Sequence, residues 1–166
     1  MIDKKIFAKI KLINNELQEL EGIAKPPRSL PMRVDLYDEL VTDTNLRKLT
    51  RKLFFNGHHA QAVEAAYKYI DNHVKRTIRP HGNDLTGQKL MTLAFSATSP
   101  LIKLNAFEGQ SEKDEQLGYM QIFAGCMTGI RNPRAHESDW EDVESRALQL
   151  LIWANHLVER INMAQE

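Results

Sequence analysis

Cysteine is almost absent from this sequence, and neither sign of charge is in excess. Because Cys126 is the only cysteine, an internal disulfide and a thiolate zinc site are both excluded. Cys126 lies in an apolar helical pattern, which predicts a buried and inert thiol. Basic and acidic side chains number 22 each, so no global field draws the chain to nucleic acid. Any RNA binding would have to come from a local basic patch.

Long apolar runs are also missing. Lysines at positions 4, 5, 9 and 11 interrupt the N-terminal segment, which therefore lacks the continuous apolar core of a signal peptide. The longest apolar runs elsewhere are far shorter than a membrane-spanning helix. We therefore expect a cytoplasmic protein with no membrane partner.

The motifs of several common catalytic classes are absent as well. None of the six histidines belongs to an HExxH-type pair, and no cluster of Asp and Glu has the spacing of a two-metal centre. No serine or cysteine nucleophile motif is present, and no glycine-rich phosphate loop follows a strand. The sequence predicts no metal site and no cofactor.

Apolar residues recur at helical spacing along most of the chain, and no segment shows the sustained alternation of a β-strand. The clearest stripe predicts a central core helix and consists of Ala60, Val63, Tyr67, Ile70, Val74 and Ile78. Cap and turn signals place further helices near residues 43–55, 84–95 and 139–163, and another that starts near 111. We expect an all-α fold, a bundle of four or five helices.

The N-terminal region differs from the rest in composition. Residues 1–23 are a predicted amphipathic helical arm, residues 24–42 a predicted proline-containing linker, and residues 43–166 the predicted helical domain. Lysines begin the arm and glutamates end it, so an antiparallel copy would pair opposite charges. This pattern favours a homodimer.

A row of glycines gives a second indication of close helix packing. Gly118, Gly125 and Gly129 lie in the helix that leads into the motif described next. Because glycine lowers helix stability, such a row predicts tight packing against another helix, in the same chain or in a second subunit.

Side chains suited to catalysis or anion binding are most concentrated in Gly129–Glu137, which holds two arginines, a histidine, an asparagine and a glutamate. Pro133 removes a backbone donor and disfavours the α conformation of the residue before it, so we expect the chain to turn here. Ser138–Glu141 has the form of a capping box that begins a new helix. Arg131 and His136 are then expected to converge on an anion such as phosphate. Alternatively, Arg131 only caps its own helix and His136 is a turn residue.

The pattern Arg131-Asn132-x-x-x-His136 resembles the signature of the HEPN superfamily, in which four to six residues separate an Arg from a His. The surrounding chain resembles one branch more closely, the Ymh-type family of conserved hypothetical proteins. The phrases that carry this resemblance follow in order from about residue 45 to the C-terminus: Leu53–Ala66, Gly87–Met91, Ala94–Ser96, Gly118–Met120, Ala124–Gly125 and Gly129–Glu137. HEPN domains are small helical bundles, which agrees with the fold expected above.

The resemblance implies metal-independent RNA cleavage, in which the ribose 2′-hydroxyl attacks its own phosphodiester. His136 would move protons near neutral pH. The planar guanidinium of Arg131 would stabilise the dianionic transition state. Asn132 would orient the ribose or the histidine, and Arg134 would bind a flanking phosphate.

Two carboxylates complete the predicted substrate-binding residues. Glu137 follows the motif histidine directly. Glu64 falls one turn after Ala60 in the core helix and is expected either to face inward, paired with Arg131, or to lie on the surface.

Partners follow from the same resemblance. Catalytic HEPN sites typically form from two motifs that face each other across a dimer, which implies a homodimer with RNA as its substrate. Related proteins often act as toxins or anti-phage factors, which implies an antitoxin or regulatory protein as a further partner. Two alternatives remain open: a non-catalytic RNA- or nucleotide-binding module, and a structural protein whose motif only ties helices together.

Overall fold

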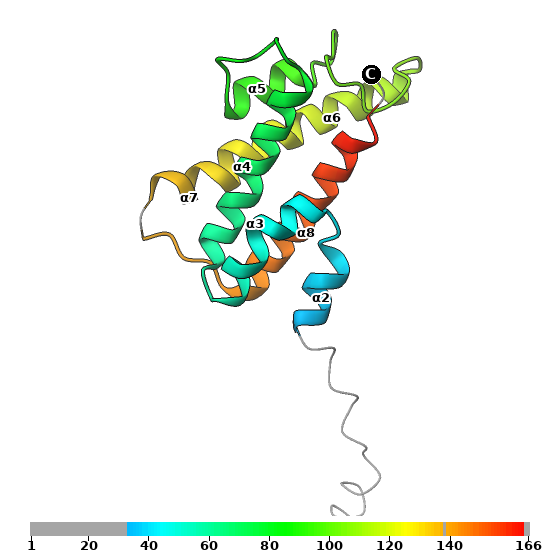
Figure 1. Cartoon of the computed structure of the whole chain (residues 1–166). Helices are drawn as coiled ribbons and strands as arrows, with labels where there is room; N and C mark the ends of the chain where they lie inside the picture. The colour runs from blue at the N-terminus through cyan, green and yellow to red at the C-terminus, as the bar shows by residue number, and fades with distance from the viewer. Residues whose placement is uncertain (1–32, 138, 165–166) are drawn as a thin grey trace, which may run out of the picture. The chain divides into compact units, whose positions relative to one another are not determined.

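Helices, joined by turns and loops, make up the part of the chain that the structure describes. The computed structural model describes residues 33–137 and 139–164, and within these ranges there is no β-strand, which confirms the predicted all-α fold. The predicted arm and the prolines of the linker lie outside the described residues. In chain order, the elements in Figure 1 are α2 (Arg33–Leu40), α3 (Thr44–Phe55), α4 (His59–Thr77), α5 (Gly87–Ala94), α6 (Gln110–Cys126), the π-helical turn η1 (Met127–Arg131), α7 (Asn132–His136) and α8 (Glu144–Asn162).

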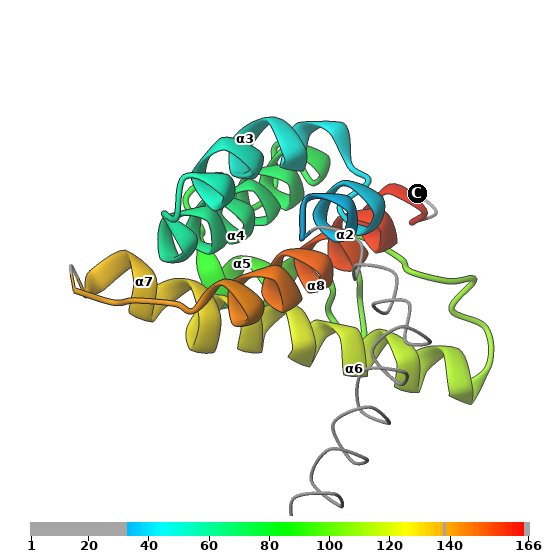
Figure 2. The ribbon, with the colours of Figure 1, turned by 90° about the horizontal axis from the view of Figure 1, so that it is seen from below.

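The centre of the bundle is α4, as its apolar stripe predicts. It packs against α3, α5, α7, α8 and η1, and Figures 1 and 2 show it among these helices. All six residues of the predicted stripe are buried, with Ala60 the most exposed at 8%. Burial of each large side chain of this kind is worth about 1.5–3 kcal/mol, which makes the stripe a main source of stability.

The boundaries of α3 agree with the cap signals. The Asp43 carboxylate accepts a hydrogen bond from the Leu46 N–H at 2.7 Å, as an N-cap residue does. At the other end, Asn56 is the C-cap and Gly57 has a φ of 82°, a left-handed conformation that glycine adopts readily. The chain therefore reverses direction here and enters α4.

Part of the predicted linker, residues 24–42, is helical. Residues 33–40 form α2, and the Tyr37 and Val41 side chains are fully buried. The Tyr37 ring stacks on Phe54 with centroids 5.1 Å apart, and its hydroxyl lies 2.6 Å from the Thr50 hydroxyl. An aromatic and a β-branched residue four positions apart form a short apolar face, which the nearby prolines obscure in the sequence.

The predicted loop after α5 is confirmed, and one buried amide holds it. Gln116 on α6 is fully buried and bonds three backbone groups of the connection. Its Oε1 accepts from the Leu104 N–H at 3.0 Å, and its Nε2 donates to the carbonyls of Phe95 at 3.1 Å and Ile102 at 3.0 Å. These bonds satisfy polar groups that would otherwise be buried without partners.

The glycine row on α6 and η1 is not closely approached by any other described part of the chain. A Cβ atom added at Gly118, Gly125 or Gly129 would find no atom within 4 Å outside the helix's own nearby backbone. The expected close contact is therefore absent among the described residues, and the contact with a second subunit stays a prediction. No described helix has the length and apolarity needed to span a membrane.

Candidate functional site

The motif lies on a continuous helical path, not on a turn. α6 passes through η1 into α7 without a break, as Figure 2 shows, and Asn132 keeps α-helical angles of φ −62° and ψ −44°. The Asn132 N–H bonds the Met127 carbonyl, five residues back. The wider π turn leaves space for the Pro133 ring beside the preceding turn, where a regular α-helix would clash with it. The predicted chain reversal at Pro133 is wrong for this reason.

Arg131, the last residue of η1, has hydrogen-bonding capacity that the described structure does not use. It is half-buried, and its Nη1 donates to the neighbouring Asn132 Oδ1 at 3.3 Å. Its Nε is buried and has no hydrogen-bond partner. A buried, unpartnered donor on a cation is costly, so it indicates a place where an acceptor binds. π turns also occur frequently at functional sites.

His136 ends α7 on the surface. Its side chain is exposed and makes no hydrogen bond with any described residue, and the adjacent Glu137 is exposed too. Because the backbone stays helical between them, Arg131 and His136 point roughly 140° apart at about 100° per residue. The expected convergence of the two side chains within one chain is therefore not found.

Arg134, which was predicted to bind a flanking phosphate, lies in a buried ion pair. Its side chain is 4% exposed and forms a two-pronged ion pair with the fully buried Asp142 carboxylate, Nε to Oδ2 at 2.6 Å and Nη2 to Oδ1 at 2.7 Å. The remaining Nη1 donates to the Ile130 carbonyl at 2.6 Å. The guanidinium also lies over the Trp140 ring, 5.3 Å from its centroid. Arg134 therefore holds α7 in place and is not free to bind a flanking phosphate.

The predicted capping box does not start the last helix. α8 begins at Glu144 with Val143 as its N-cap, and residues 139–143 are not helical. Ser138 lies outside the described residues. The ion pair from Arg134 keeps the Asp142 side chain inside the fold, while the Asp142 carbonyl lies 3.3 Å from His59 Nδ1. These two contacts hold the segment before α8 against α7 and the start of α4, and α8 begins after this segment.

Glu64 does not pair with Arg131. It is half-buried on α4, and no oxygen–nitrogen distance of 4.0 Å or less joins the two side chains in the described structure. The alternative, a carboxylate at the surface, is closer to what is found. Nor do any three His, Cys, Asp or Glu side chains group into a metal-binding cluster among the described residues.

Sequence reasoning missed two features, one beside the motif and one on α3. Asp142 is the partner of Arg134, yet a pair eight residues apart across a non-helical segment gives no periodic signal. Lys48 and Lys52 belong to a basic face of α3, which the repeated Arg-Lys pairs of the sequence could have indicated. Arg131, Asn132, His136 and Glu137 are thus the predicted residues of the motif that the described structure leaves at least partly exposed.

Comparison with known proteins gives one match. The model of the family described as "Protein of unknown function (Hypoth_ymh)" matches residues 41–161, a range that includes the motif. No curated protein and no solved structure matches the chain.

Proposed function

We propose that this chain, which belongs to the Hypoth_ymh family, is a metal-independent endoribonuclease of the HEPN type that works in the cytoplasm. The observation that carries the proposal is the unused polar capacity of the motif. Arg131 has a buried Nε without a partner, and the exposed His136 makes no hydrogen bond to a described residue. We infer that the accessible part of the half-buried Arg131 side chain and the exposed His136 imidazole bind an RNA phosphate and its neighbouring hydroxyls.

The proposed reaction needs only the RNA itself and protein side chains. The ribose 2′-oxygen attacks the adjacent phosphorus, and the bond from phosphorus to the 5′-oxygen breaks. One proton leaves the 2′-hydroxyl and one is delivered to the departing 5′-oxygen, which gives a 2′,3′-cyclic phosphate and a 5′-hydroxyl. An imidazole such as that of His136 can carry out either transfer. The fixed charge of Arg131 stabilises the extra negative charge on the phosphoryl oxygens.

Neighbouring residues position these two groups. The Asn132 Oδ1 accepts from Arg131 Nη1 at 3.3 Å, which restricts the guanidinium. Arg134 ties the helix of the motif to Asp142, so it acts through positioning rather than through contact with RNA. Glu137 is exposed beside the histidine and is available to a ribose hydroxyl.

The site is completed by a second copy of the chain. Because Arg131 and His136 diverge along one helix, an arginine of one subunit and a histidine of the other would have to meet at one phosphate. The open Cβ positions of Gly118, Gly125 and Gly129 leave a face of α6 and η1 that another helix can approach closely. A toxin or phage-defence role, controlled by an antitoxin or regulatory partner, fits an RNase of this kind.

A non-catalytic RNA-binding module is the second candidate. The divergence of the two motif side chains within one chain favours it, since a monomer would offer a phosphate the arginine without the histidine. In that case Arg131→Ala and His136→Ala would weaken RNA binding, and neither these variants nor the wild type would cleave RNA.

The experiment is RNA cleavage by purified protein in excess EDTA. Wild type should cleave, and His136→Ala and Arg131→Ala should each lose at least a hundredfold in rate, the usual scale for a proton-transfer or oxyanion group. Arg131→Lys keeps the charge but loses the planar fork, so it should recover only part of the rate. His81→Ala, at an exposed histidine in the turn before α5, is the matched control and should cleave normally. Binding without cleavage by wild type would select the second candidate.

A further inference from the structure

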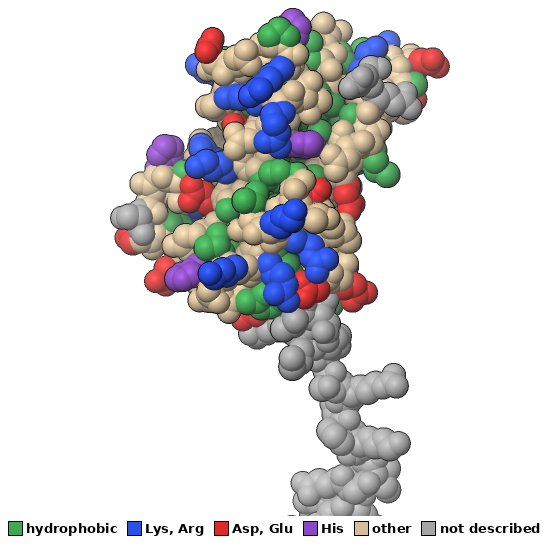
Figure 3. All heavy atoms as spheres, in the orientation of Figure 1, with side chains coloured by type: hydrophobic (Ala, Val, Ile, Leu, Met, Phe, Trp, Pro, Cys, Tyr) green, Lys and Arg blue, Asp and Glu red, His purple; other side chains and the backbone are tan. Residues whose placement is uncertain are grey.

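One helix carries a basic surface although the whole chain is neutral. α3 has the sequence TNLRKLTRKLFF, with two Arg-Lys pairs four residues apart and no acidic residue. Residues four apart lie on the same side of a helix, about 6 Å apart along its axis. Arg47 and Arg51 thus form one column and Lys48 and Lys52 another. Figure 3 shows Lys and Arg side chains gathered on the face where α3 and α4 lie.

The positive charge of this surface is only partly neutralised. Asp38 is its single ion-paired carboxylate among the described residues, and it binds both arginines: Arg47 Nη2 to Oδ1 at 2.9 Å, and Arg51 through Nε and Nη2, each at 2.9 Å. The hydrogen bonds from Arg51, followed by those from Arg47, lower the pKa of Asp38 to about 2. Lys48 and Lys52 are exposed and have no ion-pair partner in the described structure.

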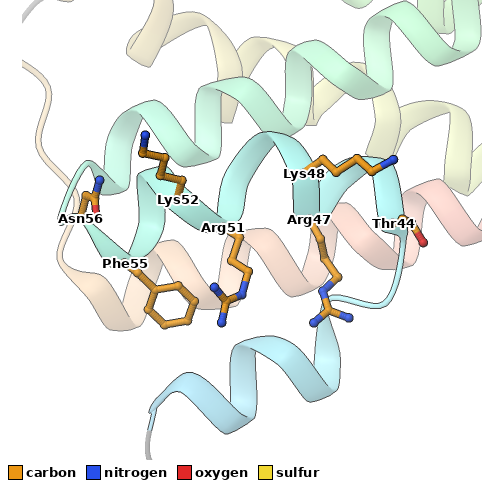
Figure 4. A pocket seen from close by; sticks show the side chains of 7 residues that line it. All are labelled: Thr44, Arg47, Lys48, Arg51, Lys52, Phe55 and Asn56. Atoms are coloured by element: carbon orange, nitrogen blue, oxygen red, sulfur yellow. The ribbon is translucent and has the colours of Figure 1, made fainter.

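These cations line a hollow with polar and aromatic groups. The hollow has a volume of about 530 Å³ and is lined by Thr44, Arg47, Lys48, Arg51, Lys52, Phe55 and Asn56. Figure 4 shows Arg47, Arg51 and Phe55 along one edge of α3, with Lys48 and Lys52 along the other. The Arg51 guanidinium lies 4.7 Å from the centroid of the Phe55 ring, which is 36% exposed. Positive charge beside an exposed ring is the combination that single-stranded nucleic acid prefers.

The C-terminal end of this surface leads toward the motif. Asn56 lines the hollow, and the next residue, Gly57, begins a second hollow of about 330 Å³ between the start of α4 and residues Trp140, Glu141 and Asp142. Asp142 is the residue that Arg134 binds, and Arg134 belongs to α7 with the motif histidine. The two hollows are thus bordered by consecutive residues of the chain, and the second lies beside the segment that anchors the proposed catalytic helix.

We propose that the α3 basic surface, formed by Arg47, Lys48, Arg51, Lys52 and Phe55, binds the phosphate backbone of single-stranded RNA and leads the strand toward the Arg131/His136 helix. The inference rests on the proposed function for its choice of RNA and deepens it with a substrate-binding site outside the motif. Lys48 and Lys52 bind phosphates as unpaired point charges. Phe55 stacks on a base, and Asn56 and Thr44 offer hydrogen bonds at the two ends of the hollow.

The test measures binding apart from cleavage. A fluorescent single-stranded oligonucleotide with 2′-O-methyl riboses cannot be cleaved by 2′-hydroxyl attack, so its anisotropy reports binding alone. Wild type is compared with Lys48→Gln/Lys52→Gln and with Lys89→Gln/Lys103→Gln. The second pair removes the same charge from exposed lysines on α5 and in the following loop. Circular dichroism and thermal melting confirm that each protein is folded.

We expect the α3 double variant to bind at least about tenfold more weakly at 0.1 M salt, and the control to bind as wild type does. The slope of log affinity against log salt should fall in magnitude by about 1.4 in the α3 variant, because each lost single-strand phosphate contact accounts for about 0.7. Equal binding by all three proteins, or no binding by wild type, would overturn the inference. Binding to anionic lipid vesicles in place of RNA would overturn it as well.

A parallel cleavage assay with ordinary RNA separates this inference from the proposed function. Binding that depends on Lys48 and Lys52 without any cleavage would refute the RNase and keep the RNA-binding surface. Cleavage by wild type with unchanged binding and cleavage by the Lys48→Gln/Lys52→Gln protein would keep the RNase and refute the surface.

Discussion

Replacing Arg134 with methionine should strongly lower the free energy of unfolding, because it removes the ion pair that holds the motif helix in place. The substitution leaves the Asp142 carboxylate, 0% exposed, without the two hydrogen bonds at 2.6 and 2.7 Å that now compensate its burial. It also frees the Ile130 carbonyl. Removing one partner of a buried ion pair typically costs about 3–5 kcal/mol, because the other charge stays buried and unpaired.

A loss of about 3–5 kcal/mol is a large fraction of the free energy of unfolding of a domain, which is typically about 5–15 kcal/mol. For a chain of this size we expect the melting temperature of Arg134→Met to fall by roughly 10–20 °C. At a urea dependence of about 2 kcal/mol per molar, the midpoint of unfolding should fall by about 2 M. Urea unfolding at pH 7, followed by circular dichroism, measures the change.

A double variant distinguishes an unpaired charge from a loss of packing. Arg134→Met/Asp142→Leu removes both charges, so it should be more stable than Arg134→Met alone. Arg134→Lys should recover only part of the stability, since an ammonium group cannot form the two-pronged contact. If Arg134→Met changed stability by less than about 1 kcal/mol while RNA binding fell, the guanidinium would be a phosphate ligand and our account of it would be wrong.

Three further predictions concern other parts of the fold. Gln116→Leu removes the partners of the Leu104 N–H and two carbonyls, so it should lower the free energy of unfolding by at least about 2 kcal/mol in a urea titration. Hydrogen bonds from Arg51 lower the pKa of Asp38 to about 2. The stabilising effect of Asp38 is therefore present above about pH 4 and is lost as the pH falls toward 2. The difference in urea midpoint between wild type and Asp38→Asn should shrink over that interval. Burial raises the pKa of the Cys126 thiol, so iodoacetamide at pH 8 should modify it far more slowly in the native protein than in urea.

Local patterns were sufficient to predict α3, α4 and much of the core. The Asp43 cap, the Asn56-Gly57 stop and the apolar stripe of α4 each depend on residues within a few positions, and each is confirmed. α2 was missed because the only fully buried apolar residues described in it and directly after it are Tyr37 and Val41, close to a proline-rich stretch. A helix this short is stabilised by tertiary packing, and a local sequence pattern holds no information on those distant contacts.

The residues of the candidate site stay a prediction from the sequence, and their geometry did not follow from it. Pro133 is a strong signal for a helix end, yet a π turn before it lets the helix continue, and the sequence gives no separate signal for that turn. Arg134 was assigned to phosphate because its partner Asp142 lies in the non-helical segment before α8, so their contact depends on the fold. The roles of Arg131 and His136 stay proposals, as does the second subunit that would bring the two side chains together.

The measurement that tests the central claim most directly is analysis of the product ends after cleavage in excess EDTA. The substrate is an RNA oligonucleotide that the wild-type protein cleaves at one position, with a matched oligonucleotide that has a 2′-deoxyribose at that position. We predict a 2′,3′-cyclic phosphate and a 5′-hydroxyl from the first, no cleavage of the second, and no products from His136→Ala. Products with a 3′-hydroxyl and a 5′-phosphate, or equal cleavage of the deoxy-substituted oligonucleotide, would contradict the proposed mechanism.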